Sequence, residues 1–157
     1  MRAITHITAS AAASAVLAAV AEPSSALGLL LFGGFLDIDH VPRFLSSGLP
    51  AGPGPMLRSV FSSEAQLNKK YSVRVGVPGN ILFPALHFVE LAALLILGGL
   101  LSGSGFLAWA GAGVLLHLLM DFRSYPCSPC FFSMTWRLLN RGRLMEAWRE
   151  HRSRVSW

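Results

Sequence analysis

The chain has 157 residues, of which 53% are hydrophobic and only 13% are charged, whereas a soluble domain carries about 25% charged residues. This composition, with a mean hydropathy of +0.52, excludes a disordered chain, and the presence of only two cysteines excludes a disulfide-dense secreted fold. The net charge of the chain is +5. In so apolar a chain, we interpret this basic excess first as a signal of membrane topology and only second as a sign of nucleic-acid binding.

Four apolar runs, arranged as two pairs, predict four helices in two hairpins. The runs cover residues 4–21, 26–36, 81–101 and 106–122. A turn with Pro23 and two serines joins the first pair, and a Ser-Gly-Ser-Gly link joins the second. About 17 to 25 apolar residues cross a bilayer, and the second run is short by this measure. We therefore expect an all-α integral membrane bundle over residues 1–125.

A long loop and a basic tail flank the predicted bundle. The loop, residues 41–80, is rich in proline and glycine, and residues 59–72 within it predict a short polar helix. The tail, residues 126–157, has leucines and tryptophans among many arginines. This pattern predicts an amphipathic helix from Thr135, with Gly142 as a point of interruption, that lies on an anionic membrane surface. A solvated arm is the alternative.

The basic residues predict the orientation of the four spans. All 13 lysines and arginines lie on the side of the termini, the long loop and the tail, and the two short links have none. Cytoplasmic loops carry the excess of these residues, so we expect a multi-pass membrane protein with both termini in the cytoplasm. A signal peptide ending at Ala19-Val20-Ala21 is the alternative, although polar residues such as Thr5 and Ser10 argue against it.

Acidic and imidazole side chains gather at the cytoplasmic ends of the predicted helices. They comprise every aspartate, and every histidine except the one in the tail: His6, Asp37, Asp39, His40, His87, His117 and Asp121. Several carboxylates buried together repel one another unless a cation or protons neutralise them. The mixture of oxygen and imidazole ligands suits zinc, with manganese or iron as alternatives. We therefore expect a divalent metal site here.

Each of these residues has an expected role. The predicted ligands of one or two metal ions are His6, Asp39, His40, His117 and Asp121. Asp37 is predicted to be catalytic, as a general base toward water or as a residue that orients a ligand. His87, expected about two turns into the third helix, is predicted to be the general acid or a further ligand.

The same residues also have structural interpretations. His117 and Asp121, four residues apart on one helix face, could form a hydrogen-bonded pair, and so could His87 with Glu90. A chain of acids and histidines could also relay protons. His6, Asp37 and His40 could respectively be an interfacial, a helix-boundary and a loop residue.

Four motifs occur in an order that is typical of one membrane protein family. They are Thr5-His6 before an alanine-rich helix, the stretch Gly34 to His40, a histidine that opens the third run, and the stretch Leu116 to Asp121. Together they resemble the YdjM-like family of membrane-bound, predicted metal-dependent hydrolases, over most of residues 4–122 outside the loop. The resemblance implies a bacterial or archaeal inner-membrane protein with a metal site built from these residues.

The resemblance departs from the family pattern at the third run. The family has His-Arg-Gly-x-Thr-His-Ser there, whereas this chain matches it only at His87. An arginine in that pattern would suit bidentate phosphate binding. Arg43, Arg74 and Arg123 are the candidates to replace it.

The leading functional prediction is a metal-dependent hydrolase that cleaves a phosphoester of a lipid or lipid-linked substrate at the cytoplasmic face. The depth of the site and its basic surroundings favour an anionic headgroup. The alternative is a non-catalytic membrane protein, either a metal or proton transporter or a scaffold with a structural metal.

Two features of the tail predict its partners and the state of its cysteines. It lacks a recognised nucleic-acid-binding pattern, so the expected partners are the bilayer and anionic lipid headgroups. The single Cys127-x-x-Cys130 pair predicts a turn with reduced thiols, with a redox pair or half a zinc site as alternatives.

Overall fold

The computed structural model describes residues 3–40, 52, 54–55, 85–122, 125, 127 and 129–155. Side chains are described within these ranges except at 40, 148–149 and 151–155. All regular elements in these ranges are helices, which confirms the predicted all-α class. The predicted polar helix over residues 59–72 lies outside the described residues.

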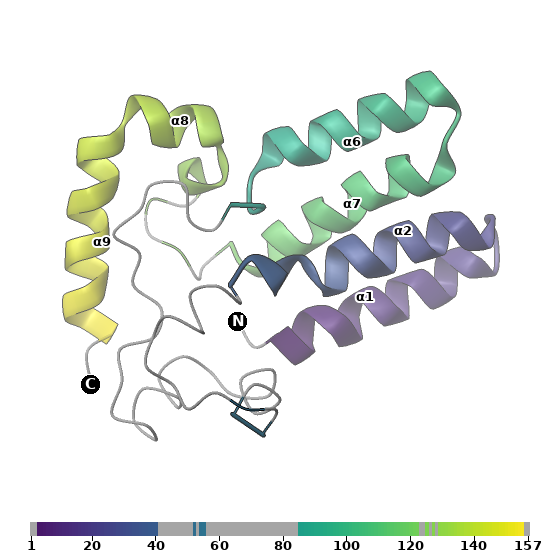
Figure 1. Cartoon of the computed structure of the whole chain (residues 1–157), viewed down its shortest axis with the longest axis horizontal. Coiled ribbons are helices and arrows are strands. Elements are labelled where there is room, and N and C mark those ends of the chain that lie inside the picture. Colours follow the sequence, from purple (N-terminus) through teal and green to yellow (C-terminus); the bar gives the residue numbers. More distant parts are fainter. Residues whose placement is uncertain are drawn as a thin grey trace.

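Four helices form two hairpins, as the apolar runs predict. They are α1 (Ala3–Ala18), α2 (Pro23–Gly34), α6 (Val89–Ser102) and α7 (Gly105–Met120). The helices lie side by side in the order α6, α7, α2, α1 (Figure 1), with α7 packed against both α2 and α6. Within the described ranges, none of the helices combines the length and the apolar character needed to cross a membrane.

Local sequence signals determine where the hairpin helices begin and end. Pro23 occupies the first turn of α2, where its missing N–H has no helical partner to lose. Gly103 ends α6 with a φ of 68°, a conformation that glycine adopts without steric cost. The hydroxyl of Ser104 then accepts a hydrogen bond from the N–H of Leu107 and caps α7. The link between α6 and α7 is therefore tight.

Glycines allow α2 and α7 to approach closely. A Cβ at Gly113 of α7 would lie 2.7 Å from the carbonyl oxygen of Leu29 and 2.8 Å from the nitrogen of Gly33, both on α2. Backbone atoms cannot move aside as a flexible side chain can. The contact therefore requires glycine, and it brings the C-terminal half of α7 against the end of α2.

The start of the third helix differs from the prediction. The apolar run suggests a helix from residue 81, but α6 begins at Val89, after Phe88 in an extended conformation with φ −143° and ψ 143°. His87 therefore precedes the helix, and the expectation of two helical turns before it is wrong. Tertiary bonds explain this, because the N–H of Leu86 donates to Asp39 and the carbonyl of His87 accepts from Arg137.

The C-terminal segment forms a second helical unit beside one end of the bundle (Figure 1). It contains the 3-10 helix η2 (Cys130–Phe132), α8 (Met134–Leu139) and α9 (Arg141–Val155). The expected interruption of the tail helix is present, but it falls at Asn140 rather than at Gly142, and the N–H and side-chain amide of Asn140 both donate to the carbonyl of Trp136. The main hydrophobic core joins this unit to the bundle through Leu36, Ala92, Val114, Leu118, Phe131, Phe132 and Leu144.

Candidate metal centre

A short 3-10 helix places two aspartates at the end of α2. This element, η1 (Leu36–His40), follows α2 after one residue. Leu36 is buried in the core with 2% exposure, whereas Ile38 is 66% exposed. The anchored leucine and the tight helix direct Asp37 and Asp39 to the same end of the bundle, where both contact the ring of His87.

The end of α7 supplies two further groups. His117 lies in the last turn of α7, and Asp121 follows the helix as its C-terminal cap, with its N–H donating to the carbonyl of His117. Their spacing of four residues puts both side chains on one face. Both side chains are buried, with 0% exposure for His117 and 3% for Asp121. The cluster therefore lies between the ends of α2 and α7 and the segment before α6.

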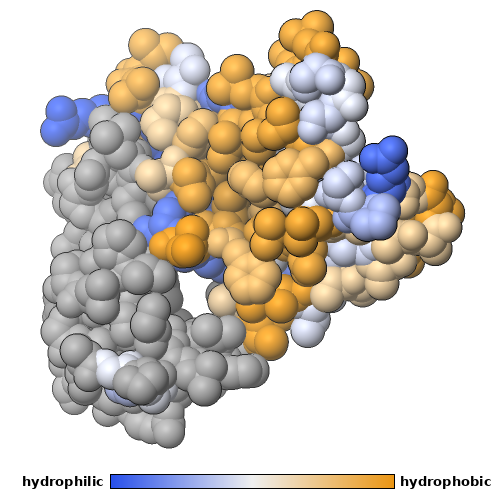
Figure 2. Space-filling model, turned by 45° about the vertical axis from the view of Figure 1, so that its right-hand side comes forward, coloured by the Kyte–Doolittle hydropathy of each residue, from blue (hydrophilic) through white to orange (hydrophobic). Residues whose placement is uncertain are grey.

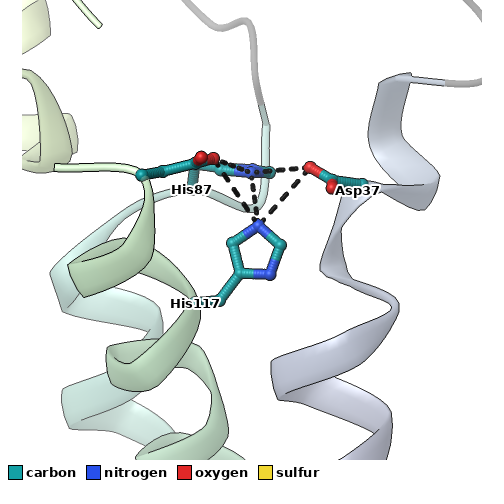
Figure 3. A group of neighbouring side chains, drawn as sticks. Asp37, His87 and His117 are labelled. Carbon is teal, nitrogen blue, oxygen red and sulfur yellow. Dashed lines mark hydrogen bonds and ion pairs between the residues drawn. The ribbon is translucent and has the colours of Figure 1, made fainter. Parts of the chain in front are cut away.

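Four ligand atoms converge in this cluster. One atom from each of Asp37, His87, His117 and Asp121 lies within 4.8 Å of the other three. The two Nε2 atoms of His87 and His117 are 3.1 Å apart, and Asp37 Oδ1 is 3.3 Å and 3.4 Å from them. Asp121 Oδ2 is 3.7 Å from each Nε2. Figure 3 shows Asp37, His87 and His117 pointing toward one another.

These separations match the requirements of a tetrahedral ion. Nitrogen and oxygen ligands bind zinc at about 2.0–2.2 Å, so neighbouring ligands of a tetrahedral ion are about 3.3–3.6 Å apart. Five of the six ligand separations, between 3.1 Å and 3.7 Å, lie close to this range, and the sixth, between Asp37 and Asp121, is within 4.8 Å. The four residues can therefore hold a metal ion without a large rearrangement.

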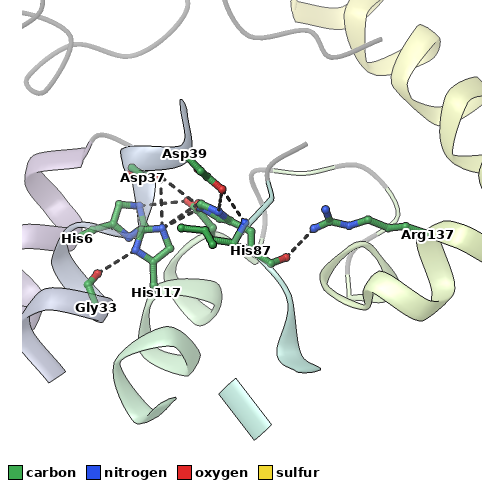
Figure 4. Close-up of polar contacts among 9 residues, drawn as sticks. His6, Gly33, Asp37, Asp39, His87, His117 and Arg137 are labelled. Carbon is green, nitrogen blue, oxygen red and sulfur yellow. Dashed lines mark hydrogen bonds and ion pairs between the residues drawn. The ribbon is translucent and has the colours of Figure 1, made fainter. Parts of the chain in front are cut away.

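The remaining ring nitrogen of each histidine is already engaged, as Figure 4 shows. His117 Nδ1 is 2.9 Å from the carbonyl oxygen of Gly33, which can only accept a hydrogen bond, so this nitrogen carries the proton. His87 Nδ1 is 3.3 Å from Asp39 Oδ2 and likewise donates to it. In the neutral rings both Nε2 atoms then present lone pairs to each other. A proton or a metal ion must lie between them to offset this repulsion.

Asp39 orients His87 in this structure. Its Oδ2 lies beside His87 Nδ1 and also accepts a hydrogen bond of 2.8 Å from the N–H of Leu86. A carboxylate that holds the outer nitrogen of a ligating histidine fixes the ring and raises its basicity. Asp39 was predicted to bind the metal directly. In the structure it instead contacts the outer nitrogen of the ligand residue His87. Asp37 and His87, predicted to be catalytic, contribute atoms to the four-atom group.

His6 packs beside the four-atom group. Its ring stacks on that of His117 with centroids 3.9 Å apart, and its Nε2 is 3.3 Å from Asp121 Oδ1. The residue is fully buried, yet among the described residues neither of its ring nitrogens has a hydrogen bond of good geometry. Asp121 therefore faces His6 with one oxygen and the other two histidines with its second oxygen.

The negative charge around His87 changes its protonation. Burial by itself lowers the pKa of His87, but the hydrogen bonds and charges of Asp37 and Asp39 outweigh this effect and raise the pKa to about 9. Without a metal ion, the ring is thus protonated at neutral pH and supplies the positive charge that the carboxylates require. A divalent cation would replace this proton.

His40 was also predicted to be a metal ligand, but its side chain is not among those that the structure describes.

Glu90 and the two cysteines had other interpretations in the sequence analysis. Glu90 does not pair with His87; its carboxylate accepts from the hydroxyl of Ser133 and from the N–H groups of Met134 and Thr135. Cys127 and Cys130 are free thiols. The structural interpretation in which His87 pairs with Glu90 is therefore wrong, because Glu90 binds the start of α8.

Sequence reasoning missed one residue at this site. Arg137, counted with the basic residues of the tail, is fully buried, and its guanidinium reaches the carbonyl of His87. Burial lowers its pKa to about 10, against the opposing effects of Tyr125, Glu90 and Asp39, so it remains charged at neutral pH. No local pattern separates this arginine from its exposed neighbours, because its burial depends on how α8 packs on the bundle.

Comparison with known proteins adds no further assignment. The chain matches no protein-family model, no curated protein and no solved structure. The resemblance to the YdjM-like family therefore stays a prediction.

Proposed function

We propose that this protein is a membrane-bound, metal-dependent hydrolase that cleaves a phosphoester of a lipid or lipid-linked substrate. The observation that carries the proposal is the convergence of Asp37, His87, His117 and Asp121 on one point, with the outer nitrogens of both histidines held by Asp39 and Gly33. Metal-ligating histidines characteristically have such an outer partner.

The donor set suggests which ion is bound and what each residue does. Imidazole and carboxylate ligands at tetrahedral spacing suit zinc, and manganese or iron are alternatives. When bound, such an ion polarises a phosphoryl oxygen and makes a water molecule more acidic. His87, His117 and Asp121 are buried and hold the ion. Asp37 is the most exposed of the four, with 24% of its side chain accessible, so we assign it to the substrate side as general base or exchangeable ligand.

The exposed surface of the bundle supports attachment to a membrane. Large apolar side chains are exposed on all four helices, and Figure 2 shows them gathered over the bundle. A soluble monomer rarely exposes so extensive an apolar surface. The residues include Val16, Leu27, Leu31, Leu94, Leu97, Leu100, Leu101, Leu115 and Leu119. We propose a location in the inner (cytoplasmic) membrane, with the termini on the cytoplasmic side and the basic α9 near anionic headgroups.

An apolar groove beside the metal centre supports a lipid substrate. It has a volume of about 310 Å³ and runs between α6, α7 and η2, lined by Val89, Leu115, Leu118, Leu119, Phe122, Pro129, Phe132 and Ser133. Val89 lies two residues after His87, and Phe122 directly follows Asp121. A hydrocarbon chain in this groove would start next to two of the ligand residues. We propose that it holds the acyl or prenyl chain while the phosphoester lies near Asp37.

Metal analysis and phosphoester turnover test the proposal. The full chain would be purified in detergent, loaded with Zn²⁺, and analysed for metal by mass spectrometry beside Asp37→Ala and His117→Ala. Leu94→Ala, an exposed position on α6, serves as the control. We expect one or two ions per chain in wild type and in the control, and a loss in His117→Ala. Equal metal in all variants would reject the ligand assignment.

Turnover then separates an enzyme from a metal-holding scaffold. Vesicles that contain a phospholipid labelled in its headgroup would be incubated with the zinc-loaded protein. We expect headgroup release that is absent from His117→Ala and reduced in Asp37→Ala. Stoichiometric metal without turnover of any phosphomonoester or phosphodiester lipid would favour the non-catalytic alternative.

A further inference from the structure

Arg137 is fully buried, with 0% exposure, whereas Arg141 and Arg143 of the same segment are exposed. Its Nε donates to the carbonyl of Phe131 and its Nη2 to the carbonyl of His87, both at 2.6 Å. The guanidinium carbon also lies 4.2 Å from the centre of the Phe131 ring. Figure 4 shows the side chain extending from α8 toward the backbone of His87. The charge is therefore directed at the segment that carries a metal ligand.

Burying a cation is expensive unless it is well hydrogen-bonded, so its position requires an explanation. Hydrogen bonds from charged donors are stronger and shorter than neutral ones. One of the two hydrogen bonds of Arg137 ends on the carbonyl of His87, which is the one member of the four-residue cluster that lies in the segment before α6. The carbonyl of Phe88, the next residue, already accepts the N–H of Leu91 in the first turn. The carbonyl of His87 thus precedes the helical ladder and receives its donor from α8.

His87 is consequently held at both ends. Asp39 binds its ring at Nδ1 and also the N–H of the preceding Leu86. Arg137 binds its carbonyl. A residue outside regular structure can rotate about its backbone dihedrals, and such a rotation would carry Nε2 away from His117. The two contacts together remove this freedom.

We propose that Arg137 is a positioning residue that fixes the backbone of His87 so that its Nε2 meets those of the other ligands. The inference rests on the metal centre proposed above. It extends the centre to α8, which lies 50 residues farther along the chain. The competing explanation is that Arg137 only anchors α8 to the bundle.

Glu90 provides an internal comparison for these two explanations. Its carboxylate binds Ser133, Met134 and Thr135 and so ties the same C-terminal unit to α6. It lies on α6 itself, and its described partners do not include His87. A change at Glu90 therefore loosens the attachment of α8 without removing a contact to the ligand residue. Arg141, which is exposed at the start of α9, provides a neutral control for an arginine substitution.

The test is a Co²⁺ titration of the full detergent-purified chain, followed by the visible absorption of the bound ion. This absorption depends on the ligand geometry, which anchoring alone does not change. The variants are Arg137→Met, Arg137→Lys, Glu90→Gln and Arg141→Lys. We expect Arg137→Met to weaken Co²⁺ binding about 10- to 100-fold, the usual effect of losing an outer contact, and to change the spectrum.

Arg137→Lys decides the matter if Arg137→Met does not fold. Lysine keeps the buried charge but lacks the planar fork that reaches two carbonyls, so we expect several-fold weaker binding and an altered spectrum. Glu90→Gln should lower the melting temperature while leaving Co²⁺ affinity within about twofold of wild type and the spectrum unchanged. Arg141→Lys should match wild type in both measurements.

The outcomes test the positioning role of Arg137 separately from the proposed metal centre. A wild-type spectrum and affinity in Arg137→Lys, or equal changes in Arg137→Lys and Glu90→Gln, would overturn the positioning role and leave the metal centre intact. Failure of wild-type protein to bind Co²⁺ at all would instead reject the metal centre.

Discussion

The Nε2 atoms of His87 and His117 face each other at 3.1 Å, although His87 lies in the non-helical segment before α6 and His117 in the last turn of α7. Each ring has its other nitrogen fixed by an acceptor, Asp39 in one case and the carbonyl of Gly33 in the other. The two Nε2 atoms are thereby brought together by contacts that are independent of any ion. The centre is preorganised, and its metal affinity should respond to both kinds of contact.

Substitution of Asp39 should weaken metal binding without abolishing it. Because Asp39 holds His87 rather than contributing to the four-atom group, Asp39→Asn should reduce Zn²⁺ affinity about 10- to 100-fold. His117→Ala removes one of the four ligands and should reduce it much further. Competitive titration against a chromogenic chelator measures both. Equal losses in the two variants would indicate that Asp39 itself binds the ion.

The stability of the metal-free protein should fall as the pH rises. The folded-state pKa of His87 is raised from 6.5 to about 9, so its protonation stabilises the fold fully below about pH 6.5, and this contribution is lost as the pH rises through 9. Its size is on the order of 3 kcal/mol, at 1.36 kcal/mol per pKa unit. Thermal unfolding in EDTA should thus give a lower melting temperature at pH 9.5 than at pH 7.

The zinc-loaded protein provides the control for this pH dependence. The ion takes the place of the proton, and protons compete with it, so the melting temperature of the loaded protein should rise between pH 6 and pH 8. The same downward slope with and without zinc would contradict a metal bound through His87.

Close packing of α2 against α7 should be essential for the centre. In Gly113→Ala, the new methyl group meets backbone atoms of Leu29 and Gly33, and overpacking of this kind costs about 1–3 kcal/mol. It should also separate the carbonyl of Gly33 from His117 and so weaken zinc binding. Chemical denaturation and metal titration measure the two effects.

Gly98→Ala is the matched control for this substitution. A Cβ at Gly98 of α6 would meet nothing within 4 Å, and alanine is the better helix former by about 0.5–1 kcal/mol. The variant should be as stable as wild type or more stable, with unchanged zinc affinity. A loss as large as that of Gly113→Ala would show that the effect is not specific to the α2–α7 contact.

A polar substitution in the apolar groove should raise KM only for substrates with a long hydrocarbon chain. Leu119 lines the groove and is 70% exposed, so Leu119→Ser should raise KM for a long-chain phospholipid several-fold while leaving KM for a water-soluble phosphoester unchanged. Leu94→Ser, equally exposed on α6 but outside the groove lining, is the control. Equal effects of both serine variants would point to general membrane attachment instead of a chain-binding groove.

The helices were predictable because their signals are local. The apolar runs, Pro23, and the Ser-Gly-Ser-Gly link place the two hairpins within a few residues of their observed bounds, except at the start of α6, which begins at Val89 and not at residue 81. The grouping of histidines and aspartates was also visible, since helix ends bring residues to a common level. His87 was misplaced because an apolar run does not reveal that tertiary hydrogen bonds hold Leu86 and His87 outside the helix.

The sequence could not predict which residue of the site binds the metal and which one positions a ligand. Asp37 and Asp39 are two residues apart in one motif, and only the turn of η1 decides which reaches His117 and which holds the outer nitrogen of His87. Arg137 required the packing of α8, which depends on long-range contacts such as those of Glu90 with Ser133. Sequence spacing carries no information about such contacts.

The bond between Asp39 and the N–H of Leu86 joins the two ends of the intervening stretch of chain, residues 40–85. Both ends are thus fastened to each other at the metal centre itself. A change in the length of that stretch therefore need not move Asp39 away from His87, provided that this bond is kept.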